Sequence, residues 1–202
     1  MSQPVVVGIR DAALHQALDE GRVVALPGVG GYQLAARHGG SGVAALMALV
    51  AADVVPYFAI GRMDQAAVLT GDWTDEIRRL AIRFWPGPLV MVVGEAAVPI
   101  RITMPTRRSV RKLCQHSGPL VMAAANGADG QAVRDVQDLQ SQFSSTEVEC
   151  IVDGGTLAGP GPSVLDCRPT PPVVLYEGAL SETFIEGALL MNARRKRWGR
   201  SS

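Results

Sequence analysis

The sequence predicts one α/β domain built on a mixed, twisted β-sheet with flanking helices. Its 202 residues are 48% hydrophobic and 19% charged, so the chain is long and apolar enough to bury a core. Short apolar runs typical of strands alternate with segments whose apolar residues recur at helical spacing. Clusters of glycine and proline separate these segments, and the sequence contains no internal repeat.

The first elements form a helix, a strand, a glycine-rich loop and a second helix. Residues 10–20 have apolar residues at helical spacing, and Gly21 stops the pattern where a helix C-cap is expected. Residues 22–26 form a short buried strand that ends before a proline, and residues 28–31 follow as a loop. With a helix at about 42–52, this order predicts a strand–loop–helix unit.

A rigid turn, Trp85-Pro86-Gly87-Pro88, divides the chain. Its two prolines exclude helix on both sides, because proline lacks an N–H and restricts the preceding residue. An amphipathic helix at 75–84 precedes the turn, and an apolar strand at 89–93 follows it. The remaining elements alternate in the same way, with strands at 57–60, 100–105, 119–125, 150–153, 164–166 and 173–176, and helices at 109–116 and 133–143. We expect a loop at 154–162 and a disordered tail at 192–202.

The formal net charge is zero, but the basic residues gather in two blocks without acids. We take seven of them as candidate RNA-binding residues: Arg101, Arg107, Arg108, Arg111 and Lys112 in the first block, and Arg194 and Arg195 in the second. Such blocks can follow an RNA backbone, with affinity supplied by counterion release. A solvated face and an unstructured terminus explain them equally well.

The sequence gives no sign of a metal site, a secretory signal or a membrane span. Its three cysteines are far apart and lack metal-ligand spacing: Cys114, Cys150 and Cys167. We expect them to be reduced, buried thiols of a cytoplasmic protein, and the N-terminus lacks a secretory pattern. The apolar run 43–60 is interrupted by Asp53 and Pro56, so a helix followed by a strand explains it better than a membrane span.

The order of motifs resembles the YrdC-type family, the threonylcarbamoyl-AMP synthases of tRNA threonylcarbamoyladenosine modification. The family's glycine-loop motif, Pro-Thr-Glu-Thr-x-Tyr-Gly-Leu, corresponds here to residues 27–34, Pro-Gly-Val-Gly-Gly-Tyr-Gln-Leu. The Trp-Pro-Gly-Pro turn matches fully. Asn126 matches the asparagine of a Ser-Ala-Asn motif, and Ser163 with Asp166 match a Ser-Thr-Val-x-Asp motif. The resemblance covers about residues 9–186, which we take as the domain, leaving 187–202 as a basic C-terminal tail.

The resemblance implies a YrdC-like domain with a concave cleft that joins threonine, bicarbonate and ATP. It places six substrate or nucleotide candidates in the cleft: Pro27, Gly28, Gly30, Tyr32, Asn126 and Ser163. ATP and Mg²⁺ are implied only if the family activity is retained. Possible partners are double-stranded RNA or tRNA and other tRNA-modification proteins. The residue types alone leave open a tight turn for the glycines, core packing for Tyr32, and turn capping for Asn126 and Ser163.

The departures from the family pattern remove polar groups. The family's Lys-x-Arg aligns with Val50-Ala51-Ala52, and its two loop threonines align with Gly28 and Gly30. The arginine of its Arg-x-Pro motif aligns with Thr103, and a late arginine aligns with Tyr176. A site for several anionic groups works by preorganised positive charge. We therefore expect a cleft without cations, no catalytic residue, and a catalytically silent domain that binds RNA or a nucleotide.

Two alternatives remain. An active synthase could use a relocated anion clamp, drawing on Arg37, Arg62 or Arg101. A binding protein for an uncharged small molecule would also fit the apolar substitutions. The oligomeric state is not predictable from the sequence.

Overall fold

Ten strands form one mixed sheet in the computed structural model, which describes residues 2–71, 73–95 and 97–198, with side chains as far as residue 190. The strand order is β1-β8-β2-β3-β7-β4-β6-β5-β9-β10. The strands are β1 (Val5–Val7), β2 (Val24–Pro27), β3 (Tyr32–Arg37), β4 (Tyr57–Ala59), β5 (Leu89–Glu95), β6 (Val98–Thr103), β7 (Leu120–Ala124), β8 (Cys150–Val152), β9 (Ser163–Asp166) and β10 (Val173–Tyr176). The sheet contains parallel pairs, such as β5 with β9, and antiparallel pairs, such as β5 with β6. The predicted mixed α/β sheet is therefore confirmed.

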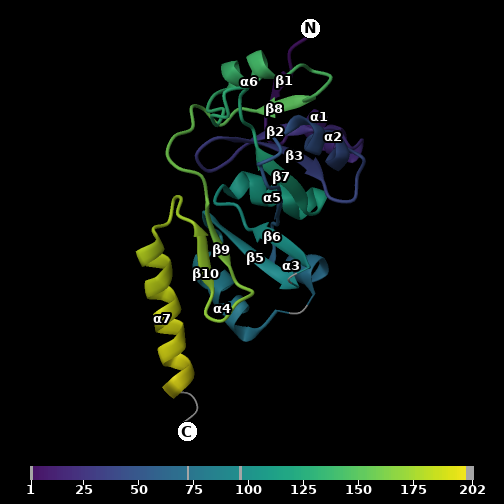
Figure 1. Ribbon diagram of the computed structural model, residues 1–202. Coiled ribbons are helices and arrows are strands. Elements are labelled where there is room, and N and C mark those ends of the chain that lie inside the picture. The colour runs from purple at the N-terminus through teal and green to yellow at the C-terminus, as the bar shows by residue number, and fades with distance from the viewer. Residues whose placement is uncertain (1, 72, 96, 199–202) are drawn as a thin grey trace.

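Seven helices flank the sheet in the described part of the chain (Figure 1). They are α1 (Ala12–Asp19), α2 (Gly42–Leu49), α3 (Met63–Thr70), α4 (Asp75–Phe84), α5 (Arg108–Ser117), α6 (Val136–Gln142) and α7 (Glu182–Trp198). Side chains that accept backbone N–H groups fix several helix starts. Asp11 caps α1, Thr74 caps α4 and Asp135 caps α6.

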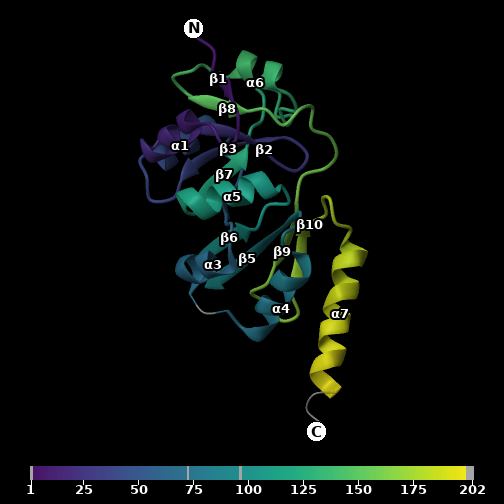
Figure 2. The same ribbon diagram turned by 180° about the vertical axis from the view of Figure 1, so that it is seen from behind.

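Three apolar clusters pack the helices onto the sheet. One joins α1 and α5 to the face of β2 and β3 that carries Leu26 and Ala35. A second joins α2 and α6 to the opposite face, around Leu34 and Ala123. The third packs α3, α4 and α7 onto the sheet. The two ribbon views show these helices in the other half of the molecule (Figures 1 and 2). A single sheet therefore runs through both halves of the domain.

The predicted strand–loop–helix unit at the N-terminus is wrong in one element. Residues 32–37 form β3, which pairs antiparallel with β2 so that Val24 faces Ala35. The glycine loop is thus the turn of a hairpin, and α2 begins only after β3. Burial explains the difference, because β3 lies between β2 and β7 and all but its last residue are buried. The sequence analysis also omitted β1 and α3.

The C-terminal tail is helical where we predicted disorder. Helix α7 continues to Trp198, past the expected start of disorder at residue 192. Its anchor is Ile185, which is buried in the third cluster, and Phe184 lies edge-on to Phe84 of α4. The side chains of Arg194 and Arg195 lie outside the described residues. None of the described helices is both long and apolar enough to span a membrane.

The three cysteines are buried and free, and we predict that they are chemically silent in the folded protein. Burial raises the pKa of the Cys114 and Cys167 thiols to about 12 and that of Cys150 to about 11. Because the thiolate is the reactive form, a thiol-specific chromogenic reagent at mildly alkaline pH should modify none of them in native protein. All three should react in denaturant. Rapid modification of a native thiol would contradict this packing.

Candidate functional site

A cavity of about 620 Å³ opens beside the glycine loop and is lined by strands from both halves of the sheet. Its volume is within the range of small-molecule sites. Five valines supply much of its apolar wall: Val29, Val54, Val55, Val90 and Val164. Six polar side chains face it as well: Gln33, Asp53, Tyr57, Arg101, Asn126 and Arg134. The cavity therefore combines apolar walls with a few polar groups, as ligand sites do.

Two arginines line this cavity, so the expectation of a cleft without cations is wrong, and missing positive charge no longer supports a catalytically silent domain. Arg101 projects from β6, and Arg134 precedes the Asp135 cap of α6. Neither guanidinium makes a hydrogen bond or ion pair with any residue that the structure describes. The two other arginines considered for a relocated clamp are engaged elsewhere, Arg37 with Asp19 at 2.7 Å and Arg62 with Asp64 at 2.9 Å. Both lie outside the cavity lining.

Strand periodicity explains how Arg101 reaches the cavity. Side chains two residues apart lie on the same face of a strand. Arg101 is two residues before Thr103, the position that aligned with the family's arginine, so both lie on one face of β6. The Thr103 hydroxyl instead donates to the Leu89 carbonyl at 2.7 Å. Arg101 thus lies one same-face step along the strand from Thr103.

The glycine loop has a backbone that requires glycine. Gly30 has φ of +76°, and a Cβ there would lie 2.6 Å from the carbonyl carbon and oxygen of Pro160. A Cβ on Gly28 would lie 2.6 Å from Cγ of Gln33, a side chain that is almost fully buried. Gln33 accepts a hydrogen bond from the Tyr57 hydroxyl at 3.1 Å. Threonine hydroxyls at positions 28 and 30 are therefore incompatible with this loop conformation.

Tyr32 belongs to the scaffold of the cavity. It is fully buried, donates from its hydroxyl to the Gly155 carbonyl at 3.1 Å and accepts from the Gly154 N–H at 2.9 Å. Burial raises the pKa of this phenol. Its ring packs in the cluster beneath α2 and α6, and it ties β3 to the segment after β8.

Ser163 is also part of the scaffold. It is fully buried at the start of β9. Its hydroxyl donates to the Leu180 carbonyl at 2.7 Å and accepts from the N–H groups of Gly178 and Leu180, each at 2.9 Å. One hydroxyl thus fixes the chain between β10 and α7.

The remaining candidates lie at the cavity or next to it. Gly30 and Asn126 line the cavity itself. Pro27 and Gly28 line a smaller hollow of about 30 Å³, which shares Val29, Tyr57 and Pro162 with the cavity. The structure therefore brings four of the six candidates together and leaves Tyr32 and Ser163 behind the wall. Sequence analysis missed Gln33, Tyr57 and Arg134.

The first basic block does not form one continuous surface. Arg101 lines the cavity, and Arg107 lines the smaller hollow. Arg111 donates to the carbonyls of Pro105 and Thr106, which fixes the entry to α5. Arg108 and Lys112 line neither of these and instead line a separate pocket.

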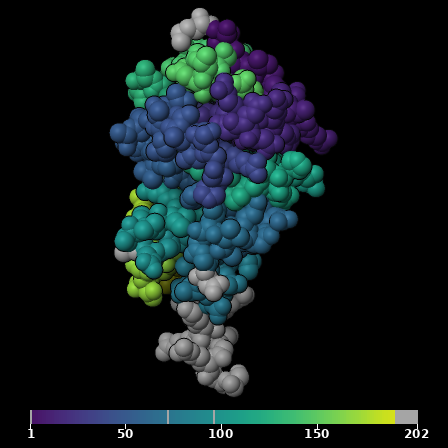
Figure 3. Space-filling model, turned by 90° about the vertical axis from the view of Figure 1, so that its right-hand side faces the viewer, coloured from purple at the N-terminus to yellow at the C-terminus, as the bar shows by residue number. Residues whose placement is uncertain are grey.

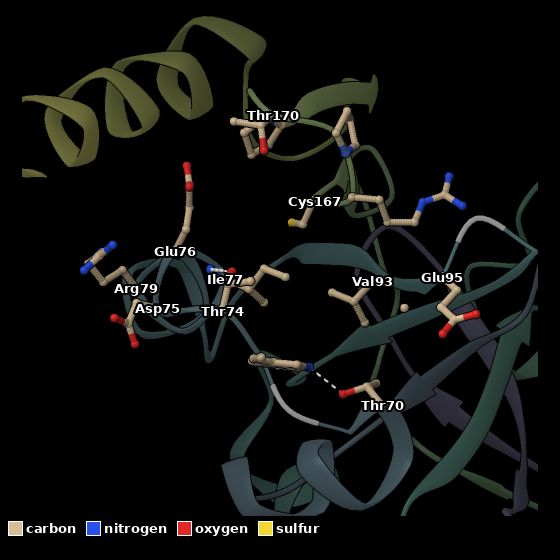
Figure 4. A pocket seen from close by; sticks show the side chains of 15 residues that line it. Thr70, Thr74, Asp75, Glu76, Ile77, Arg79, Val93, Glu95, Cys167 and Thr170 are labelled. Carbon is tan, nitrogen blue, oxygen red and sulfur yellow. Dashed lines mark hydrogen bonds between the residues drawn. The ribbon is translucent and has the colours of Figure 1, made fainter.

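A second cavity, of about 640 Å³, lies at the other end of the sheet between α4, β5 and the turn that follows β9 (Figure 4). Its lining has acidic side chains on α4 and at the end of β5, namely Asp75, Glu76 and Glu95. Asp75 and Arg79 point away from Val93 and Cys167 in this view, and the Trp73 indole donates to Thr70. None of the sequence-predicted site residues lines it. Within the described ranges, no cluster of three or more His, Cys, Asp or Glu residues is arranged to hold a metal ion.

Comparison with known proteins identifies the fold and the family. The Sua5/YciO/YrdC family model, described as telomere recombination, matches residues 16–178. The curated threonylcarbamoyl-AMP synthase of Pyrococcus abyssi is 31% identical over 139 residues, which are 63% of this chain and 41% of that protein. The chain therefore spans about two fifths of the length of this relative.

Two solved structures have the same architecture. P. abyssi Sua5 complexed with L-threonine has a TM-score of 0.77 at 27% identity, covering 93% of this chain and 60% of that one. E. coli YciO has a TM-score of 0.75 at 19% identity and shows the fold alone, with 91% of this chain and 100% of that chain covered. Motifs, fold and family model agree, and we conclude that the chain belongs to the Sua5/YciO/YrdC family.

Proposed function

We propose that this chain is a cytoplasmic nucleotide-binding domain linked to tRNA threonylcarbamoyladenosine modification, and that it does not itself make threonylcarbamoyl-AMP. One observation carries the binding half of the proposal. Arg101 and Arg134 line a cavity of about 620 Å³ without a partner in the described part of the chain. Guanidinium groups hold phosphate bidentately and stay charged at all physiological pH values.

The other polar groups of the cavity suit the rest of a nucleotide. The Asn126 amide and the Gln33 amide each offer donor and acceptor atoms for a base or ribose. Valines and the half-exposed Tyr176 supply apolar surface for a base. Two unpaired cations make an uncharged ligand a poor match, because their desolvation would not be compensated.

The glycine loop supports the proposal that this chain does not make threonylcarbamoyl-AMP. P. abyssi Sua5 is a threonine complex in the crystal, whereas this chain carries no hydroxyl at positions 28 and 30. The loop backbone excludes a simple return of threonine there, as its contacts with Pro160 and Gln33 indicate. Losing one hydrogen bond to a charged group costs about 1.5–3 kcal/mol. Each lost bond would therefore slow the reaction by about tenfold or more.

Isothermal titration calorimetry with ATP, ADP and adenosine tests the binding half. We expect ATP and ADP to bind more tightly than adenosine, because the phosphates meet the two guanidiniums. Threonine and Mg²⁺ should each leave the ATP affinity unchanged to within about twofold, which is about 0.4 kcal/mol. Equal affinity for adenosine and ATP, or no binding of any of the three, would refute the proposal.

A further inference from the structure

The separate pocket that Arg108 and Lys112 line has a volume of about 350 Å³. It lies between α1 and α5, apart from the cavity proposed for the nucleotide. The two helices pack together in one apolar cluster, and the space-filling view shows the purple α1 region above a teal α5 region on one flank (Figure 3). Ile9 and Leu113 contribute the apolar lining of the pocket. None of its lining residues lines the nucleotide cavity.

The polar residues that line this pocket are three cations, one histidine and one serine. They are Arg10, His15, Arg108, Ser109 and Lys112, with no carboxylate among them. None of these side chains has a hydrogen bond or ion pair within the described residues. By contrast, four other arginines of the described chain are ion-paired, namely Arg22, Arg37, Arg62 and Arg168. Even Asp11, next to Arg10, is used to cap α1 through the Ala13 N–H.

The arrangement leaves like charges unbalanced on one helix face. Arg108 and Lys112 are four residues apart on α5, so their side chains are neighbours, and like charges at this spacing repel. The first turn of α5 contains no acidic residue, and its N-cap residue, Arg107, offers no side-chain cap. The positive end of the helix dipole is therefore uncompensated.

The imidazole of His15 lacks a hydrogen-bond partner at one of its ring nitrogens. Its Nδ1 atom is buried and has no hydrogen-bond partner. A buried polar atom of this kind is rare in folded proteins and requires an explanation. The His15 ring meets the His116 ring edge-on, with centroids 5.0 Å apart, so the imidazole is held in place at the pocket wall.

We propose that this pocket is an anion site that binds a phosphate group, either free or within an RNA backbone. Arg10, Arg108 and Lys112 supply positive charge, the Ser109 hydroxyl supplies a directed hydrogen bond, and His15 forms part of the pocket wall behind them. The three cationic residues are exposed, so the phosphate would bind at the rim of the pocket. This inference does not depend on nucleotide binding in the larger cavity.

Histidine NMR reports on the site directly, because the chain has only three histidines. Inorganic phosphate should shift the signals of His15 and His116 and saturate, at constant pH and ionic strength. His38 should not move, since it lies against Phe58 on another part of the fold, and it serves as an internal control. Arg108→Ala and Lys112→Ala should each weaken phosphate binding about fivefold, the upper range for exposed pairs. Arg62→Ala, which removes a paired surface arginine, should have no effect.

A short RNA duplex distinguishes the two sources of phosphate. If the duplex shifts the same two histidines and the Arg108→Ala change weakens its binding, the site takes an RNA backbone phosphate. If only inorganic phosphate shifts them, the site takes a free phosphate group. The absence of any His15 shift, a common shift of all three histidines, or an unchanged response in the Arg108→Ala, Lys112→Ala double variant would overturn the proposal.

Discussion

Replacing Arg101 and Arg134 together by alanine is expected to weaken ATP binding by about 100-fold, and each single replacement by about tenfold. A hydrogen bond to a charged group contributes about 1.5–3 kcal/mol, and each 1.4 kcal/mol is about a tenfold change in affinity. We take the lower end because Arg134 is exposed to solvent. Isothermal titration calorimetry of the single and double variants gives these ratios.

The matched control is Arg62→Ala, because Arg62 is an exposed arginine that pairs with Asp64 outside the cavity. We expect it to bind ATP like the unmodified protein. The adenosine affinity of the double variant should also stay unchanged, since adenosine has no phosphate for the guanidiniums to hold. Wild-type ATP affinity in the double variant would show that the phosphates bind elsewhere.

Replacing Ser163 by alanine is expected to lower the free energy of unfolding by about 3 kcal/mol. The change leaves two N–H groups and one carbonyl without their buried partner, and each such group costs about 1–3 kcal/mol. Urea unfolding at equilibrium measures the difference. The structure thus assigns Ser163 a role in holding the segment between β10 and α7.

Ser41→Ala is the control for this substitution. Ser41 is exposed before α2, and its side chain caps no helix N–H, so its loss should change stability by less than about 0.5 kcal/mol. The alternative role for Ser163 is contact with the nucleotide. A Ser163→Ala protein of normal stability with much weaker ATP binding would favour that role and contradict ours.

Local pattern predicted much of the fold. The amphipathic helix α4, its Trp-Pro-Gly-Pro stop and strand β5 were expected at their observed positions, because helical spacing and proline act within a few residues. Strand β3 was missed because its last residue alone is exposed, which leaves no alternation of apolar and polar residues. Its pairing with β7 is a long-range contact that spacing does not encode.

The candidate site was less predictable for the same physical reason. Arg134 stands in a loop, and backbone contacts such as the bridge between Asn126 and Ala132 hold that loop over the cavity. Arg101 was one of three arginines considered for a relocated clamp, and of these three it alone lines the cavity. Gln33 gave a weak signal, since a polar residue between Tyr32 and Leu34 interrupts an apolar run. The family motifs marked Tyr32 and Ser163, but a motif does not distinguish a ligand contact from a scaffold bond.

The central claim is that this chain binds a nucleotide but does not catalyse threonylcarbamoyl-AMP synthesis. Pyrophosphate release by the purified protein, supplied with ATP, Mg²⁺, threonine and bicarbonate, tests this claim most directly. We predict no release above the rate without protein, at ATP concentrations that calorimetry shows to be saturating. Release that depends on both threonine and bicarbonate would contradict the account and establish the chain as an active synthase.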